Sequence, residues 1–179
     1  STGGFTEVLL DRGATEVVAV DVGYGQLAWS LRSDSRVTVI ERTNVRDLTP
    51  DAIGGPVDLV VSDLSFISLA TVLPALTVCA SSHADIVPMV KPQFEVGREQ
   101  VGAGGGVVSD PELRTAAVLA VATRAAELGW QAIGATASPL PGPSGNVEYF
   151  FVAACRNRQR IARRRTGRAV RRAVAEGPQ

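Results

Sequence analysis

Short apolar runs rich in β-branched residues recur along the first half of the sequence, and each carries an acidic residue at or near one end. The runs cover residues 16–22, 37–41, 57–63 and 85–90. Runs of this length and composition are typical of strands that are buried on both faces of a parallel sheet. The pattern therefore predicts a sheet of mainly parallel strands, and it constrains the fold more than any other feature of the chain.

Helix-like segments separate these runs, as the crossover connections of a parallel sheet require. The predicted helices cover residues 6–12, 26–32, 69–80 and 111–128. The last two predicted strands, 130–137 and 147–155, are joined by a short Pro- and Gly-rich loop instead. A direct loop of this kind joins antiparallel strands, so we expect an α/β fold with a mostly parallel sheet and an antiparallel last strand.

The chain is long enough to form a domain with its own hydrophobic core. It has 179 residues, of which 45% are hydrophobic and 20% are charged. We predict one domain over residues 1–155 and an arginine-rich tail over residues 156–179. No apolar stretch approaches the roughly 20 residues that span a bilayer, and no basic and apolar leader follows Ser1. We therefore expect a cytoplasmic protein without membrane association.

Cysteine and histidine are too scarce for the chemistry that they usually support. Cys79 and Cys155 are isolated thiols in unrelated apolar contexts, so they predict neither a disulfide framework nor a metal site. His83 is the only histidine, and it lies in a polar segment that we interpret as a loop. We therefore predict no metal ion and no histidine-based catalytic triad.

The formal net charge of zero averages two segments of opposite sign. Residues 156–179 hold nine arginines and one acid, a net charge of +8, which leaves −8 for residues 1–155. Such a segment either binds phosphate backbones by charge or forms a solvated basic helix. Lys91 is the only lysine among the 18 basic residues. Lysine alone among the basic side chains here carries a readily titratable amine, so we examine Lys91 as a catalytic candidate.

A glycine turn opens the sequence. Gly3 and Gly4 lead into the first predicted helix, and Asp21 follows 17 residues after Gly4, at the end of a predicted strand. This spacing is typical of a nucleoside-binding unit, in which glycine lets the backbone approach the ligand and the acid binds the ribose hydroxyls. A plain turn is the alternative. Asn44, after the second predicted strand, either lies beside an adenine ring or caps a helix.

Two chemically active side chains end neighbouring strands of the predicted sheet. Asp63 ends one buried run and Lys91 follows the next, while Glu148 begins the last predicted strand. Ligands of open α/β sheets bind at the carboxyl ends of the strands. A desolvated lysine can act as a base that a carboxylate orients, although a plain ion pair between Asp63 and Lys91 fits the spacing as well. The glycine-rich segment 102–106 is either a lid over this edge or a plain solvent-exposed loop.

Five segments carry a resemblance to a known family. They are 1–6 (STGGFT), 20–27 (VDVGYGQL), 61–67 (VSDLSFI), 90–99 (VKPQFEVGRE) and 142–149 (GPSGNVEY). Together they resemble the FtsJ-like ribose methyltransferases and, within these, the TlyA, or haemolysin-A-like, branch of rRNA 2′-O-methyltransferases. The match runs from Ser1 to about Cys155, and the 90–99 block is its most specific part.

The resemblance implies a Rossmann-like S-adenosylmethionine-dependent methyltransferase fold, with S-adenosylmethionine as methyl donor and the rRNA of ribosomal subunits as partner. It also implies a Lys-Asp-Lys-Glu tetrad at the ribose 2′-hydroxyl, and Asp63, Lys91 and Glu148 match its last three members. The residues that the resemblance implies for the cofactor are Gly3, Gly4, Phe5, Thr6, Asp21, Val22, Asn44, Val45 and Asp63. The tetrad's first lysine, the first strand and an S4-type RNA-binding domain have no counterpart, so we expect a truncated chain.

Three other functions share part of the pattern. A dinucleotide-dependent oxidoreductase would use the same glycine turn and Asp21, but the full Gly-x-Gly-x-x-Gly is absent. A membrane-lytic protein, which the haemolysin name suggests, would need the tail as its membrane face. A non-catalytic RNA-binding module would depend on the tail and not on Lys91. The sequence leaves open the target nucleotide, the oligomeric state and the activity of the chain by itself.

Overall fold

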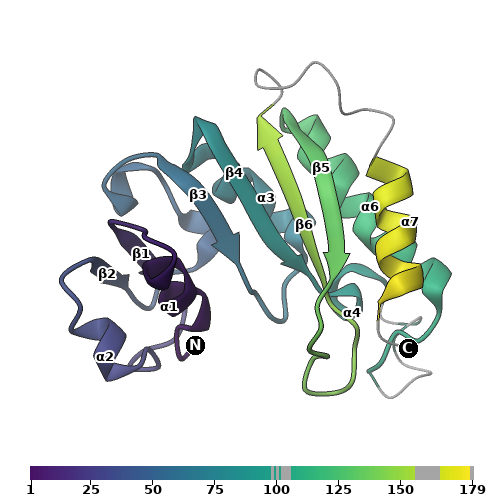
Figure 1. The fold of residues 1–179 in the computed structure, drawn as a ribbon, viewed down its shortest axis with the longest axis horizontal. Helices are drawn as coiled ribbons and strands as arrows, with labels where there is room; N and C mark the ends of the chain where they lie inside the picture. The colour runs from purple at the N-terminus through teal and green to yellow at the C-terminus, as the bar shows by residue number, and fades with distance from the viewer. Residues whose placement is uncertain (98, 100, 102–105, 156–165, 178–179) are drawn as a thin grey trace. The chain divides into compact units, whose positions relative to one another are not determined.

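The computed structural model describes residues 1–97, 99, 101, 106–155 and 166–177 (Figure 1). The chain divides into two compact units, Ser1–Gly55 and Pro56–Gln179. Both units combine helices with a parallel strand pair, β1 with β2 and β3 with β4, which confirms the predicted α/β class. The candidate lid lies, apart from Gly106, outside the described residues, and so does the tail from 156 to 165.

The first unit is built on two parallel strands. Its elements are α1 (Gly4–Asp11), β1 (Val17–Val20), α2 (Trp29–Arg32), β2 (Val37–Ile40) and two 3₁₀ turns, η1 (Val45–Asp47) and η2 (Asp51–Ile53). Val17 lies opposite Val37 and Val20 opposite Ile40, so both strands end at the same edge. The helices and strands predicted here are confirmed, although both strands are shorter than the apolar runs that predicted them.

The second unit holds a four-stranded sheet in the order β3-β4-β6-β5. Its elements are β3 (Val57–Ser62), α3 (Leu69–Val78), β4 (Ala80–Val90), α4 (Pro92–Glu95), α6 (Pro111–Glu127), β5 (Trp130–Ala137), β6 (Tyr149–Cys155) and α7 (Thr166–Glu176). β3 and β4 are parallel, while β6 runs antiparallel to both β4 and β5. The prediction of an antiparallel last strand is therefore confirmed.

Two helices contribute most of the buried apolar side chains that pack with the sheet of the second unit. α3 and α6 contact one another, and each contacts β4. Val72 and Leu73 from α3 and Val118 and Val121 from α6 are inaccessible to solvent. α6 begins where the sequence predicts, because the side chain of Asp110 accepts a hydrogen bond from the backbone of Glu112 at 2.8 Å.

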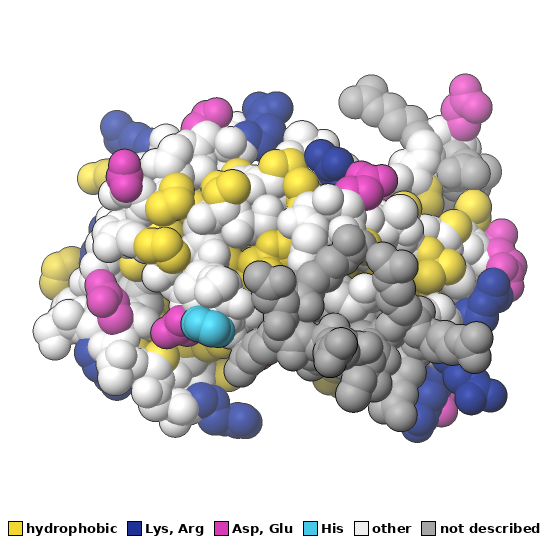
Figure 2. Space-filling model, turned by 90° about the horizontal axis from the view of Figure 1, so that it is seen from above, with side chains coloured by type: hydrophobic (Ala, Val, Ile, Leu, Met, Phe, Trp, Pro, Cys, Tyr) yellow, Lys and Arg dark blue, Asp and Glu magenta, His cyan; other side chains and the backbone are white. Residues whose placement is uncertain are grey.

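The segment around His83 is a strand, so its interpretation as a loop is wrong. β4 begins at Ala80, and its polar first half includes the exposed His83, the cyan side chain in Figure 2. The pairing with β3 is irregular between Val57 and Leu59. Polar residues in an exposed half-strand lack the apolar alternation by which strands are recognised, so the pattern concealed this part of β4.

The tail contains a packed helix. α7 contacts β5 and α6, and it buries Val170, Ala173 and Val174 against them. The boundary predicted at residue 155 stays a prediction. None of the helices in the described part of the chain combines the length and the apolar character needed to cross a bilayer.

Candidate active site

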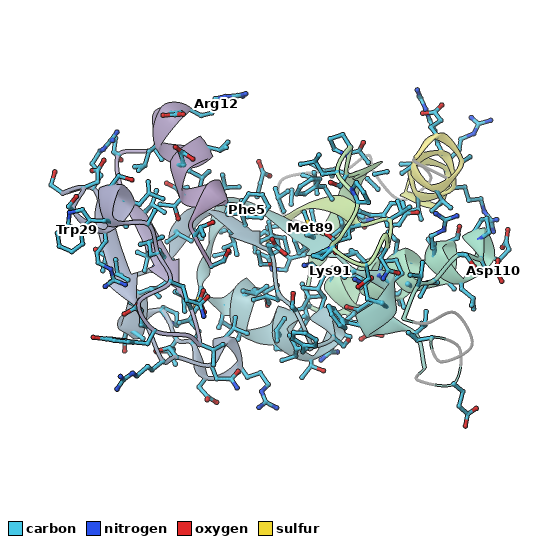
Figure 3. The ribbon with its side chains drawn as sticks, turned by 90° about the horizontal axis from the view of Figure 1, so that it is seen from below. Phe5, Arg12, Trp29, Met89, Lys91 and Asp110 are labelled. Carbon is cyan, nitrogen blue, oxygen red and sulfur yellow. The ribbon has the colours of Figure 1, made fainter. Side chains whose placement is uncertain are left out.

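Three strand ends of the second unit bring the predicted catalytic residues together. Asp63 directly follows β3, Lys91 directly follows β4 and Glu148 directly precedes β6. Val90 of β4 pairs with Tyr149 of β6, so Lys91 and Glu148 each lie one residue beyond a paired position. Because β6 is antiparallel to β4, its first residues reach the edge where β3 and β4 end. Figure 3 labels Lys91 at this edge.

The Lys91 amine lies close to three polar side chains, those of Asp63, Glu148 and Ser65. Its Nζ lies 2.7 Å from Asp63 Oδ1 and 3.6 Å from Glu148 Oε1. It also donates a hydrogen bond to the hydroxyl of Ser65 at 3.3 Å. The Lys91 and Glu148 side chains are 10% and 8% exposed, whereas that of Asp63 is 47% exposed. The cluster is therefore buried on its Glu148 side and open on its Asp63 side.

The position of Glu148 depends on a glycine and an amide. A Cβ on Gly142 would lie 2.8 Å from Glu148 Oε1, closer than a side chain allows. Gln93 donates a hydrogen bond from its Nε2 to the same oxygen at 3.4 Å. The backbone carbonyl of Glu148 accepts a hydrogen bond from Ser138 at 2.8 Å. These contacts hold one carboxylate oxygen beside the Lys91 amine.

A buried asparagine fastens the loop that precedes Glu148. Asn146 is 2% exposed, and its Oδ1 accepts a hydrogen bond from the backbone of Val108 at 2.9 Å. Its Nδ2 donates to the carbonyl of Gly106, also at 2.9 Å. Sequence reasoning missed this role, although Asn146 lies within the 142–149 segment that carried the resemblance. Its amide joins two segments about 40 residues apart, a relation that local pattern cannot reveal.

Glu95 caps a neighbouring helix from outside it. Its carboxylate accepts hydrogen bonds from the Ser68 hydroxyl and the Leu69 backbone, both at 2.7 Å, at the beginning of α3. Burial raises the pKa of Glu95 above its usual value, and the hydrogen bonds from α3 oppose that rise. The contact ties α4, which follows Lys91 directly, to α3.

Phe66 lies in the loop between β3 and α3 in an unusual conformation. Its φ of 63° is in the left-handed region, and its side chain is 92% exposed. Its ring centre lies 5.3 Å from that of Phe94. Non-glycine residues rarely adopt this φ, and such strain gathers at functional sites. Sequence reasoning placed Phe66 in a motif but assigned it no role.

The predicted cofactor residues of the first unit gather at α1 and at the ends of its two strands. Gly3 has a φ of 103°, and a Cβ there would lie 2.5 Å from Leu27 and Leu31 atoms, so this turn requires glycine. A Cβ on Gly4 would meet nothing within 4 Å, so the first turn of α1 has open space beside it. Phe5 and the buried Thr6 follow within α1.

Acidic and polar side chains follow the two strands of this unit. Asp21 directly follows β1 and accepts a hydrogen bond from the backbone of Gly23 at 2.7 Å, and the next residue, Val22, is 71% exposed. Asn44 lies beyond β2, and its side chain accepts a hydrogen bond from the backbone of Arg46 at 3.0 Å. Asn44 therefore caps the turn that begins at Val45, the alternative that the sequence left open. An acidic side chain, an exposed apolar side chain and the open space beside the first turn of α1 are groups suited to binding a nucleoside.

Comparison with known proteins identifies the family of this α/β chain. Residues 1–155 match the FtsJ-like methyltransferases. The chain belongs to the FtsJ-like methyltransferase family. This match confirms the predicted family, which implies S-adenosylmethionine as the cosubstrate.

The resemblance to the TlyA branch is also confirmed. The chain is 70% identical over 178 residues to the 16S/23S rRNA (cytidine-2′-O)-methyltransferase TlyA of Mycobacterium tuberculosis, over 99% of this chain and 66% of that protein. The chain thus spans just under two thirds of that relative. A solved structure from Streptococcus thermophilus that carries a haemolysin name superposes with a TM-score of 0.90 at 37% identity, over 98% of this chain and 62% of the other.

A more distant structure shows the fold alone. The 16S rRNA (adenine(1408)-N(1))-methyltransferase W203A mutant from Catenulisporales acidiphilia has a TM-score of 0.55 at 16% identity, over 87% of this chain and 82% of the other. The Rossmann-like methyltransferase fold that the sequence implied is therefore confirmed.

Proposed function

We propose that this chain transfers the methyl group of S-adenosylmethionine to the 2′-oxygen of a cytidine ribose in ribosomal RNA. The observation that carries the proposal is the Lys91 amine, which is buried between Asp63 and Glu148 at the carboxyl edge of the sheet. The name of the Mycobacterium tuberculosis relative, which modifies cytidine in 16S and 23S rRNA, supports the substrate.

Lys91 takes the central role in this reaction. In its neutral form the Nζ of Lys91 would accept the proton of the ribose 2′-hydroxyl as the oxygen attacks, and Asp63 and Glu148 would hold the amine in place. The substrate approaches from the Asp63 side, because that carboxylate is the exposed member of the cluster. Ser65 accepts a hydrogen bond from the amine and so holds it along a third direction. Alignment of the reacting atoms contributes the rest of the rate enhancement over the uncatalysed reaction.

Residues of the first unit are proposed to hold the donor. Gly3, Gly4, Phe5 and Thr6 would contact its methionine part, and Asp21 and Val22 would contact its ribose. The turn that Asn44 caps, with Val45, would lie beside the adenine. When bound, S-adenosylmethionine supplies a methyl group on a positively charged sulfur, which is already an activated leaving group. The open beginning of α1 and the acid after β1 support this assignment.

The exposed ring of Phe66 supports an RNA substrate. It lies three residues after Asp63, and it offers an aromatic face on which an unpaired base can stack. Recognition of RNA sequence relies on such unstacked bases, and a ribose reached by Lys91 must belong to an accessible nucleotide. The strained backbone conformation of Phe66, with its positive φ, supports a functional role for this exposed ring.

The experiment that tests the proposal measures binding and transfer separately. Calorimetry with S-adenosylhomocysteine should show binding to the chain, and Asp21→Ala should weaken it. Methyl transfer from labelled S-adenosylmethionine to 16S and 23S rRNA should yield 2′-O-methylcytidine, and Lys91→Ala should lower kcat by at least about 100-fold. Arg124→Ala, which removes a surface ion pair on α6, is the control. Wild-type activity in Lys91→Ala, or a chain that neither binds nor transfers, would overturn the proposal.

A further inference from the structure

A hollow lies between the edge strand of the second sheet and the last helix. It has a volume of about 960 Å³ and is lined by residues 134–139 from β5 and the loop after it, and by α7. The polar side chains that α7 contributes are Arg168, Arg172 and Glu176. Because β5 is the last strand in the order, its outer edge presents backbone groups without a strand partner. Backbone N–H groups and guanidinium groups together are donors that suit phosphate oxygens.

α7 exposes its charge and buries its apolar residues. Val170, Ala173 and Val174 are 1%, 7% and 4% exposed, whereas Arg168, Arg171 and Arg172 are all exposed. Figure 3 shows nitrogen-tipped side chains projecting from α7, the yellow helix, away from the sheet. Figure 2 shows dark-blue side chains grouped at the end of the unit that carries α7. Because α7 packs on β5 and α6 through its apolar side, its arginines are held together on the exposed side of the helix.

Only part of this charge is neutralised by other described residues. Arg172 is held by Glu176, whose two carboxylate oxygens lie 2.9 and 3.0 Å from its Nε. Within residues 166–177, Glu176 is the only acid, and the described structure records no ion pair for Arg168 or Arg171. A polyanion is the partner that complements such a surface.

The hollow is connected to the candidate active site through the sheet. Ala137 of β5 pairs with Tyr149 of β6, and Tyr149 pairs with Val90 of β4, the residue before Lys91. The end of β5 thus lies two strands from Lys91, about 10 Å away at normal strand spacing. Ser138 lines the hollow and also donates its backbone hydrogen bond to Glu148. A strand of RNA at Lys91 can therefore extend into the hollow.

We propose that the hollow between β5 and α7 binds the phosphate backbone of the RNA segment that flanks the methylated nucleotide. Arg168, which lines the hollow, and Arg171, which lies beside it on the exposed side of α7, contact phosphate groups, and Glu176 limits the affinity by pairing with Arg172. This inference rests on the proposed function for the nature of the RNA. The buried apolar face of α7 argues against a lipid surface as the partner, because a membrane-binding helix inserts that face.

The test measures the affinity for a 23S rRNA transcript across a range of salt concentrations. The double variant Arg168→Ala/Arg171→Ala should bind more weakly, and the slope of log affinity against log salt should become shallower by about 1 for each phosphate group that the variant leaves unbound. Glu176→Gln should bind more tightly with a steeper slope, because it frees Arg172 and removes the acid from the hollow. Thr136→Glu, which places a carboxylate on the exposed edge strand, should weaken binding. Arg124→Ala should behave as the wild type.

The outcomes separate this proposal from the proposed function. Unchanged RNA affinity and an unchanged salt slope in the double variant would overturn the hollow as an RNA site. So would a double variant that loses binding to phosphatidylglycerol vesicles but keeps its affinity for RNA. Binding of S-adenosylhomocysteine and kcat at saturating RNA should stay at wild-type values in the arginine variants. If Lys91→Ala keeps full activity while the arginine variants lose RNA affinity, the proposed function is wrong and the RNA site in the hollow stands.

Discussion

The Glu148 carboxylate occupies the space beside Gly142, which leaves no room for a side chain at position 142. A Cβ there would lie 2.8 Å from Glu148 Oε1, the oxygen that also faces the Lys91 amine. The loop that holds Gly142 is closed by its own backbone hydrogen bond to the carbonyl of Asn146 at 2.8 Å. The backbone of this loop therefore limits where the Glu148 carboxylate can lie, because backbone atoms shift less easily than a side chain does.

Gly142→Ala tests this contact. The new methyl group should displace the Glu148 carboxylate, and we expect kcat for rRNA methylation to fall by about 100-fold, since small misplacements in active sites have effects of this size. Binding of S-adenosylhomocysteine should be unchanged. Gly167→Ala is a matched control, because a Cβ there meets nothing within 4 Å. Equal kcat values in the two variants would contradict the positioning role.

Lys91→Met tests the electrostatics of the buried pair. The change leaves the buried Glu148 carboxylate without its cation, and we expect the free energy of unfolding to fall by about 3 kcal/mol. Adding Glu148→Gln removes the unpaired charge, so the double variant should regain part of that loss. Urea titrations of the wild type and the three variants measure the coupling. Strictly additive losses would show that the two side chains do not interact.

Glu95→Gln tests the pH dependence that burial predicts. The pKa of Glu95 is raised above its usual value in the folded chain, so the folded state holds this proton more tightly than the unfolded state. Its contribution to stability is therefore present below about pH 4.5, the unfolded value, and is lost as the pH rises through the folded pKa. The stability of the wild type relative to Glu95→Gln should decrease over that window. A stability difference between the two proteins that stays constant with pH would contradict this prediction.

Asn146→Ala tests the fastening of the loop before Glu148. The variant leaves the Val108 N–H and the Gly106 carbonyl without their partners, and one of them is buried. We expect a loss of about 2 kcal/mol in the free energy of unfolding, the usual cost of a buried polar group left unpaired. Thermal unfolding measures it, and faster hydrogen exchange at Val108 would locate the effect. A stability equal to that of the wild type would show that water replaces the amide.

The resemblance and the local pattern together predicted most of the candidate active site. Asp63, Lys91 and Glu148 were predicted from their places at the ends of apolar runs, and the structure brings all three together. Gln93, Asn146 and Gly142 were missed as positioning residues, since their contacts join segments far apart in the chain. His83 was placed in a loop because the exposed half of β4 has no apolar alternation.

The sequence by itself determined the α/β class, the order of the strands along the chain and the functional side chains that lie close to the strand ends. These are local properties, because apolar periodicity, helix caps and glycine turns depend on neighbours within a few residues. Tertiary structure alone decided that β6 lies between β4 and β5, which places Glu148 beside Lys91. It also decided that α7 packs on β5 and keeps its arginines exposed. Strand order and helix packing depend on the burial of surfaces that are distant in sequence, so no local pattern records them.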